Sequence, residues 1–332
     1  MKLLVLGGTV FVGRHIVEAA LAKGHQVTIL HRGHSPKPEY WNVQEILSDR
    51  DGGLSAVGTE QWDAVIDCNG YVPRIVRDSA NYFQNRTKCY LFISSISVYE
   101  PDENGNRKVI VRDQPVQGEV VNTETYSLLK VECENQIKDI FGGKSIIIRP
   151  CVVAGAYDPT NRFTYWADRF ARYSQVLVPE PPESPMQVID VRDLADFCMK
   201  QLENVKESSN EPKIFDAVGK RISLQNLVDS GEKLGNGKAI WLSKDQLELG
   251  DLKIGVDFPL TWEKSDWNDV RITVNPMDTA SAGLSIRNLD ETMKYTMDYA
   301  MSFPNKLPSK SVLSGNVGLD RNKEEEIIKS LG

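Results

Sequence analysis

Hydrophobic residues in the first half of the chain form short, nearly unbroken runs that alternate with stretches of helical periodicity. The runs occupy residues 2–6, 26–30, 43–47, 64–67, 90–94 and 145–148. Segments with helical spacing lie between several of them, at residues 12–23, 74–83 and 126–140. Runs that are apolar on both faces are typical of parallel strands covered by helices on each side. The alternation therefore predicts an α/β fold with a doubly wound parallel sheet.

This regular pattern ends near Arg149, and Pro-rich connections such as VPEPPESP at residues 178–185 follow it. We expect the sheet domain to span residues 1–150 and to carry the catalytic groups. A smaller mixed α/β lobe, interleaved with the sheet and facing the substrate, is expected at residues 151–302. The last segment, residues 303–332, is expected to be a polar tail that ends in a short helix at residues 321–331.

Composition and charge narrow the classes of function. The hydrophobic fraction of 41% and charged fraction of 26% are ordinary for a soluble globular protein. A formal net charge of −7 argues against nucleic-acid binding, which needs a concentrated Lys and Arg surface. The apolar start MKLLVL ends at a glycine pair, too short for a signal peptide or a membrane span, so we expect a cytoplasmic protein without membrane attachment.

The cysteines and histidines give no metal-binding pattern. The five cysteines are scattered without a C-x-x-C spacing, which is typical of buried thiols in a reducing compartment. The four histidines all lie within the first 34 residues, and none forms an H-E-x-x-H pair. The sequence therefore predicts no metal site.

A glycine-rich turn, GGTVFVG at residues 7–13, follows the first apolar run and precedes an amphipathic helix. Glycines in this context permit a tight turn and a close approach of the backbone to a pyrophosphate, whose charge the helix N-terminus meets. The alternative is an ordinary turn between strand and helix. Val10 stands where a G-x-x-G-x-x-G pattern would place its middle glycine. The residues expected to hold a dinucleotide here are Gly7, Gly8, Thr9, Phe11, Val12 and Gly13.

Polar residues at the ends of later strands favour a nicotinamide dinucleotide. The second run ends at His31 and Arg32, and an Arg at this position can pair with the 2′-phosphate of NADP, with NAD as the alternative cofactor. The other interpretation is that Arg32 stacks on adenine or lies in solvent. Asp49 is placed to accept from the adenine amino group, and Asn69 with Gly70 lies over the expected ribose. The expected cofactor set also includes Arg50, Tyr126, Lys130 and Pro150.

A Tyr and a Lys with i, i+4 spacing, Tyr126 and Lys130, share one face of the helix predicted at residues 126–140. A nearby ammonium favours the phenolate, so we expect the tyrosine pKa to fall from about 10 toward the working pH of a general acid/base. Ser95, at the end of the fifth run, can hold a substrate oxygen beside the phenol. Y-x-x-x-K also occurs by chance on surfaces, but the serine-rich run and the glycine turn favour the catalytic interpretation.

These motifs resemble those of the extended short-chain dehydrogenase/reductases, the NAD-dependent epimerase/dehydratase superfamily. The matching segments are GGTVFVG at 7–13, SSISVYE at 94–100, YSLLK at 126–130, IRP at 148–150 with Gly155 downstream, and VIDVRDLA at 188–195. The GGT-x-F-x-GR form at 7–14 is similar to an atypical branch, labelled isoflavone-reductase-like, and to chloroplast stem-loop-binding proteins. The resemblance implies a Rossmann fold and a homodimer formed through helices that flank the active site.

The resemblance also implies roles for individual residues. Tyr126 is then the catalytic acid/base, and Lys130 is its partner and binds the nicotinamide ribose. Ser95, four residues before Tyr99, occupies the position of the catalytic hydroxyl. Several sugar-nucleotide members carry an Asn where this chain has Val152, which puts a nucleotide-sugar substrate in doubt. The remaining substrate candidates are Ser97, Val152, Arg162 and Arg192.

We expect the substrate pocket between the strand ends at Ser95 and Gly155 and the second lobe, with residues 100–122 and 156–163 at its rim. Arg162 is the candidate for an anionic substrate group, and its alternative is a pair with Asp158 or Asp168. The leading hypothesis is an NAD(P)-dependent reductase, epimerase or dehydratase that acts on a hydroxyl or carbonyl of a small polar metabolite. The others are a dinucleotide-sensing regulatory or RNA-associated protein, and a relic with an intact but unused site.

Overall fold

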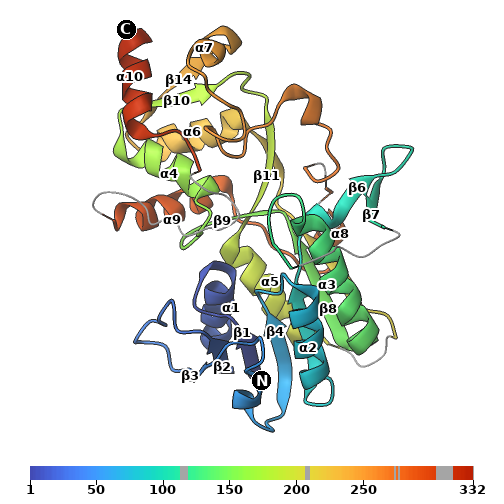
Figure 1. Ribbon diagram of the computed structural model, residues 1–332. Coiled ribbons are helices and arrows are strands. Elements are labelled where there is room, and N and C mark those ends of the chain that lie inside the picture. The colour runs from blue at the N-terminus through green and yellow to red at the C-terminus, as the bar shows by residue number, and fades with distance from the viewer. Residues whose placement is uncertain (113–118, 206–209, 273, 276, 304–316, 332) are drawn as a thin grey trace. The chain divides into compact units, whose positions relative to one another are not determined.

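The computed structural model describes residues 1–112, 119–205, 210–272, 274–275, 277–303 and 317–331, and its chain forms two compact units (Figure 1). The first, here called the sheet unit, comprises Met1–Cys151, Val191–Val218 and Val274–Ser285. The second unit comprises Val152–Asp190, Gly219–Thr273 and Ile286–Gly332. No helix among the described residues is long and apolar enough to cross a membrane.

The sheet unit is built on seven parallel strands in the order β12-β8-β5-β4-β1-β2-β3. These strands are β1 (Lys2–Leu6), β2 (Gln26–His31), β3 (Gln44–Leu47), β4 (Trp62–Asp67), β5 (Thr87–Ile93), β8 (Ser145–Pro150) and β12 (Lys213–Ala217). The direction in which strands are added reverses at β1, between β2 and β4, which is the topological switch point where such sheets bind ligands. The predicted doubly wound parallel sheet is confirmed.

Helices cover both faces of this sheet (Figure 1). Helices α2 (Pro73–Phe83) and α3 (Tyr126–Phe141) pack together over a core that contains Leu4 and Leu6 of β1. Side chains alternate along a strand, so the fully buried Leu3 points to the other face, where α1 (Phe11–Ala22) packs against α5 (Val191–Glu203). The shorter elements of the unit are η1 (Leu54–Val57), η2 (Ile96–Val98), β6 (Tyr99–Pro101), β7 (Arg107–Val109), η3 (Gly142–Lys144) and α8 (Met277–Ala280).

The chain returns to the sheet unit after residue 150 with residues 191–218 and 274–285, which lie within the lobe that was expected at residues 151–302 to be interleaved with the sheet. Strand β12 pairs with β8 in parallel register, and α5 covers the sheet beside α1. The reason is visible in the burial of the returning segment, since α5 buries Leu194, Phe197 and Leu202. A strand edge and an apolar helix face both need a partner, and the sheet supplies it.

The second unit has small sheets and helices around its own apolar core. Its strands are β9 (Val152–Ala154), β10 (Gln175–Pro179), β11 (Pro185–Asp190), β13 (Arg221–Ser223) and β14 (Lys238–Leu242). Its helices are α4 (Arg162–Arg172), α6 (Leu224–Leu234), α7 (Lys244–Leu249), η4 (Lys264–Asp266), α9 (Leu289–Met301) and α10 (Arg321–Leu331). Trp166, Phe170 and Phe258 are fully buried in the core. Helix α10 belongs to this unit, so the end of the tail is part of the folded protein.

Candidate active site

Backbone conformation or close packing favours glycine at three positions of the turn between β1 and α1. Gly7 and Gly8 have φ angles of 103° and 97°, which L side chains rarely adopt. A Cβ added at Gly13 would lie 2.7 Å from the backbone nitrogen of Gly8, where only a glycine fits. Val10, in contrast, has an extended backbone with φ −127° and a side chain that is 44% exposed. No glycine is therefore required at position 10, and the turn has the shape of a phosphate cradle.

Asn69 and Gly70, just past the end of β4, lie beside this turn. A Cβ added at Gly7 would lie 3.7 Å from the Asn69 amide nitrogen. Arg50 was expected at the cofactor, but its buried guanidinium donates to both carboxylate oxygens of Asp67 at 2.6 and 2.8 Å and to the Asn69 side-chain oxygen at 3.0 Å. A fully buried carboxylate needs a cation, and the pair formed here fixes Asn69 from beneath. Burial alone would raise the Asp67 pKa, but Arg50 outweighs it and lowers that pKa.

The residues at the end of β2 differ in exposure. His31 is buried, and its Nδ1 accepts a hydrogen bond from the Gly33 amide at 3.2 Å. The Arg32 side chain is 63% exposed and lies 4.0 Å from Asp49, whose side chain is 51% exposed. Such a loose surface pair is weak and both side chains can rotate, so Arg32 is available to an incoming phosphate.

Lys130 is buried at the carboxyl ends of β4 and β5. Its ammonium donates to the carbonyl oxygens of Gly70 at 2.9 Å and Ile93 at 2.8 Å, which uses two of its three N–H donors. The ring of Tyr71 lies 4.5 Å from the same nitrogen, and the rings of Tyr71 and Tyr126 are 6.2 Å apart. The structure thus brings Gly70, Lys130 and Tyr126 together. It also adds Tyr71, which the sequence did not single out because one Tyr after a strand end carries no pattern.

Ser95 lies between β5 and the short helix η2, and its side chain caps the N-terminus of that helix. Its hydroxyl oxygen accepts from the Ser97 amide at 3.1 Å and from the Ser97 hydroxyl at 2.9 Å. A hydroxyl has two acceptor positions and one donor, so the Ser95 hydrogen remains for another acceptor, such as a substrate oxygen. Helix η2 packs against α3, the helix that carries Tyr126 and Lys130.

A buried polar network lies beneath the serine. Ser94 donates to Glu134 at 2.6 Å, and Glu134 forms two hydrogen bonds with Arg149, at 2.8 and 2.5 Å. Arg149 also donates to the Tyr99 hydroxyl at 2.6 Å, and Tyr99 donates to Asp216 at 2.9 Å. Sequence reasoning did not single out this network, although Glu134 continues the Tyr126 and Lys130 spacing by another four residues.

Burial and nearby positive charge shift the pKa values of the acids in this network in opposite directions. Burial raises the Glu134 pKa, but the hydrogen bonds and charge of Arg149 outweigh it, and the net pKa lies below the ordinary value. For Asp216 burial prevails over the bond from Tyr99 and the nearby Arg107, and its pKa is raised. Burial also raises the pKa of Tyr99 to about 12. Glu134 is therefore ionised and Tyr99 is neutral at neutral pH.

The remaining expected residues are divided between the two units. Pro150 ends β8, and Arg192 lies in the first turn of α5, both in the sheet unit. Val152 begins β9 in the second unit, and Arg162 begins α4 there. The Arg162 guanidinium donates to the Thr160 hydroxyl at 3.2 Å. Burial raises the pKa of Asp158, and the charge of the nearby Arg162 opposes this only in part. Arg172 pairs with Asp168 at 2.6 Å. Of the expected rim segment 100–122, residues 113–118 lie outside the described residues.

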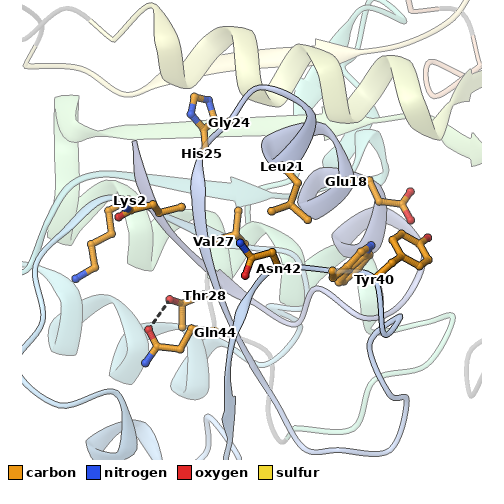
Figure 2. A pocket seen from close by; sticks show the side chains of 12 residues that line it. Lys2, Glu18, Leu21, Gly24, His25, Val27, Thr28, Tyr40, Asn42 and Gln44 are labelled. Atoms are coloured by element: carbon orange, nitrogen blue, oxygen red, sulfur yellow. Dashed lines mark hydrogen bonds between the residues drawn. The ribbon is translucent and has the colours of Figure 1, made fainter.

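A cleft of about 810 Å³ lies elsewhere in the sheet unit (Figure 2). It is lined by Lys2, Gln26 and Gln44, which begin β1, β2 and β3, and by Glu18 and Leu21 from α1. The residues expected to bind a dinucleotide lie at the opposite, carboxyl ends of the same strands. The cleft is therefore separate from the expected cofactor site. Among the described residues, no group of three or more His, Cys, Asp or Glu is arranged to hold a metal ion.

The chain thus has a Rossmann-like parallel sheet with a glycine turn after its first strand, and it carries Tyr126 and Lys130 on α3. Residues 3–216 match the NAD dependent epimerase/dehydratase family, and the chain belongs to this family. It is 24% identical over 253 residues to the chloroplast stem-loop binding protein of 41 kDa b of Arabidopsis thaliana. That alignment covers 70% of this chain and 63% of the relative, so the chain spans less than two thirds of that protein's length.

Solved structures share the fold at lower identity. The UDP-glucuronic acid 4-epimerase of Bacillus cereus, in complex with UDP-glucuronic acid and NAD, superposes with a TM-score of 0.65 and 17% identity. MoeE5, in complex with UDP-glucuronic acid and NAD, gives a TM-score of 0.63 and 15% identity. Each comparison covers 91% of this chain and 99% of the other. At this identity the likeness establishes the fold alone.

Proposed function

We propose that this protein is an NAD(P)-dependent reductase, epimerase or dehydratase that acts on a hydroxyl or carbonyl of a small polar metabolite. The observation that carries the proposal is the buried Lys130 ammonium, which lies at the carboxyl ends of β4 and β5 and one helical turn from Tyr126. A buried cation at a strand end has a desolvation cost that a purely structural role does not explain. Its remaining N–H donor is available to a ribose hydroxyl or to the Tyr126 phenol.

The side chains of the site divide the work of a reaction at a carbinol carbon. The Ser95 hydroxyl donates to the substrate oxygen and holds it, because its acceptor positions are already used by Ser97. The Tyr126 phenol moves a proton to or from that oxygen as general acid/base. Lys130 stabilises the phenolate form by its charge. When bound, the nicotinamide ring takes up or returns a hydride at the carbon.

The residues at the glycine turn fit a dinucleotide, since a Cβ would fill the cradle at Gly13. We propose NADP as the cofactor because the exposed Arg32 can pair with a 2′-phosphate. NAD is the alternative, supported by the NAD named in the solved structures. We further propose the atypical, isoflavone-reductase-like branch of the family, a homodimer, and a reducing compartment such as the cytoplasm, which suits the five free cysteines.

A metabolite screen that follows the fluorescence of the reduced cofactor tests the activity. Wild-type protein is loaded with NADPH or NADP and mixed with pools of small hydroxy and carbonyl metabolites, with Tyr126→Phe as the inactive control. A signal change that occurs with wild type and not with Tyr126→Phe supports the proposal. Failure of the protein to bind either dinucleotide contradicts it.

Nucleotide sugars are a separate arm of this screen. Val152 lacks the amide that would contact the nucleotide, so we expect no strong binding of UDP or dTDP sugars, although solved relatives are named with UDP-glucuronic acid. We propose Arg162 as the contact for an anionic substrate group. Calorimetric titration of the cofactor-loaded protein checks both points. Micromolar binding of a nucleotide sugar contradicts the first, and unchanged substrate affinity in Arg162→Ala contradicts the second.

RNA association is the second candidate, because a curated relative is a stem-loop binding protein. The net charge of −7 opposes it, since RNA binding relies on a basic surface. A sensor or RNA-binding protein also has no need for Ser95, Tyr126 and Lys130 together. Titration of a labelled RNA stem-loop at two salt concentrations distinguishes the candidates. Salt-sensitive micromolar binding without turnover of any metabolite favours the RNA role.

A further inference from the structure

The six residues Ser94–Tyr99, here called the serine arc, connect the end of β5 to the start of β6 and carry Ser95. Inside the arc, Ser95 is bonded only to its near neighbours, through the Ser97 amide, the Ser97 hydroxyl and the Val98 amide. These local bonds set the shape of the arc. They do not determine where the Ser95 hydroxyl lies relative to the phenol of Tyr126, which is carried by a different element.

Both ends of the arc are bound to one buried ion pair. At the first end Ser94 donates to Glu134 at 2.6 Å, and at the other end Tyr99 accepts from Arg149 at 2.6 Å. Glu134 and Arg149 are joined by two hydrogen bonds, at 2.8 and 2.5 Å. Arg149 belongs to β8, the neighbour of β5 in the sheet. The pair therefore spans the base of the arc and connects its two ends to the sheet.

Glu134 also connects this base to the catalytic helix. Tyr126, Lys130 and Glu134 follow one another at four-residue intervals on α3, so they lie along one side of the helix. The Glu134 side chain is completely buried, and Lys138 is its third partner, at 3.1 Å. One carboxylate thus holds the arc that carries Ser95 and stands on the helix that carries Tyr126 and Lys130.

A buried ion pair contributes little to stability by itself, because a protein in which apolar residues of similar volume replace the pair is often equally stable or more stable. What such a pair supplies is a single geometry, since its hydrogen bonds are satisfied in one arrangement only. Catalytic groups need this, because a misplacement of about 1 Å can cost on the order of a hundredfold in rate.

We propose that Glu134 and Arg149 are positioning residues, which hold the serine arc in register with α3 so that Ser95 and Tyr126 meet the same substrate oxygen. Ser94 and Tyr99 are the contacts through which the pair acts on the arc. This inference rests on the proposed function for its catalytic consequence. Its mechanical part, the attachment of the arc, is testable without any substrate.

The test removes the two side-chain contacts between the arc and the ion pair and leaves the buried charges paired. The backbone hydrogen bonds from the Ser94 amide to Ile148 and from the Ile110 amide to Val98 remain. In the double variant Ser94→Ala, Tyr99→Phe, Glu134 keeps both bonds from Arg149, and Asp216 keeps its ion pair with Arg107 at 3.1 Å. Glu134→Gln and Arg149→Lys are less suitable because they disturb a buried charge and can fail to fold. The matched control is Lys138→Met, which removes one partner of Glu134 and none of the contacts with the arc.

Three measurements are made on each variant. Hydrogen exchange by mass spectrometry reports the amides of residues 95–98, and we expect at least tenfold faster exchange there in the double variant, with wild-type exchange in β1 and β4 and in the control. Unchanged exchange at residues 95–98 overturns the proposal. A dinucleotide affinity within about twofold of wild type, which is a change of about 0.4 kcal/mol, shows that the cofactor site is intact.

Turnover on the substrate found in the screen gives the third measurement. We expect kcat to fall roughly tenfold to a hundredfold in the double variant, with KM for the dinucleotide unchanged. The single variants should lie between, because each leaves one end of the arc attached. Faster exchange with unchanged kcat overturns the positioning role. If no substrate is found, the proposed function fails, whereas the exchange result still decides whether the pair holds the arc.

Discussion

At the scale of single residues, protein groups already occupy most of the hydrogen-bonding positions of Lys130 and Ser95. Lys130 has two of its three donors on carbonyl oxygens, and Ser95 has both acceptor positions occupied. Each group is therefore left with one hydrogen to offer. Two donors fixed in this way suit a substrate oxygen and a neighbouring phenol or ribose hydroxyl, and they are poor partners for a cation.

Tyr126→Phe isolates the proton-transfer role. The substitution removes only the phenolic oxygen, so turnover should fall by roughly a hundredfold to ten-thousandfold while dinucleotide affinity stays near wild type. Lys130→Ala should reduce both, since its ammonium is assigned to ribose as well as to the phenol. Steady-state rates and cofactor titrations check this, with the exposed Tyr40→Phe as control. Wild-type turnover in Tyr126→Phe would show that another group carries the proton.

Gly13→Ala tests the cradle. The new Cβ would lie 2.7 Å from the Gly8 backbone nitrogen and 3.0 Å from its Cα, and backbone cannot move aside as a flexible side chain can. We expect dinucleotide affinity to fall at least about tenfold, with a stability loss of about 1–3 kcal/mol from overpacking. Val10→Gly, at an extended and exposed position, is the matched control and should leave affinity within about threefold. Equal effects of the two substitutions would contradict the assignment.

Arg32→Ala tests the choice of cofactor. Charge-assisted hydrogen bonds contribute about 1.5–3 kcal/mol in general, but a side chain that is 63% exposed is screened by water. We therefore expect NADP affinity to fall roughly fivefold, a change near 1 kcal/mol, and NAD affinity to stay constant. Parallel titrations of both dinucleotides check it. An equal response of NAD and NADP would remove Arg32 from the 2′-phosphate site.

Arg50 and Arg32 show what sequence reasoning can distinguish at this scale. Both are arginines near strand ends, and both were assigned to the cofactor. Arg32 is exposed, whereas Arg50 is buried against Asp67, and only the three-dimensional pairing separates them. A buried carboxylate recruits its cation from wherever the fold brings one, and no local pattern records that choice.

At the scale of elements, the hydrophobic periodicity of the sequence predicted the main strands and helices of the first 150 residues. The strands and helices that the apolar runs and helical spacings predicted in the first 150 residues all occur, with ends that differ by a few residues, as for β5, which begins at Thr87. The short strands β6 and β7 were not predicted. The Tyr126 and Lys130 pairing on one helix face followed from spacing alone. The third member of that face, Glu134, was missed because its partners Ser94 and Arg149 come from β5 and β8.

Helix α10 is attached to the second unit by a buried ion pair as well as by the packing of Ile327 and Ile328 against the core. Glu324 is completely buried, accepts from the Leu177 amide at 3.1 Å and pairs with Arg169 of α4 at 2.8 Å. Glu324→Ala should destabilise the second unit by about 3 kcal/mol, because the mostly buried Arg169 loses a charged partner. Urea denaturation followed by tryptophan fluorescence measures it. The control is Glu326→Ala on the exposed side of the same helix, and equal midpoints for the two variants would contradict a buried role.

At the scale of the whole molecule, the sequence indicated two bodies but not how the chain is shared between them. The sequence predicted a second lobe interleaved with the sheet without naming the returning segments, which in the structure are residues 191–218 and 274–285. The local sequences of strand β12 and helix α5 do not indicate to which of the two units these elements belong. Which sheet receives them is decided by the open edge of β8, a long-range pairing that composition does not encode.

Asp67 and Asp216 of the sheet unit should contribute to the pH dependence of folding stability with opposite signs. Arg50 overcomes the burial of Asp67 and lowers its pKa, whereas burial prevails at Asp216 and raises its pKa. The unfolded chain binds an aspartate proton near pH 4. The folded protein binds fewer protons than the unfolded chain at Asp67, so the stability owed to its ionised form is present above about pH 4 and is lost as pH falls through the folded pKa.

Asp216 has the opposite linkage, because the folded protein keeps its proton to higher pH than the unfolded chain does. Its contribution to stability therefore decreases as pH rises from about 4 through the raised pKa. Urea midpoints of wild type, Asp67→Asn and Asp216→Asn, followed by circular dichroism from acid to neutral pH, separate the two. The wild-type advantage over Asp67→Asn should grow with rising pH, and that over Asp216→Asn should shrink. Slopes of the same sign for both variants would contradict the assigned balance between burial and pairing at one of the two acids.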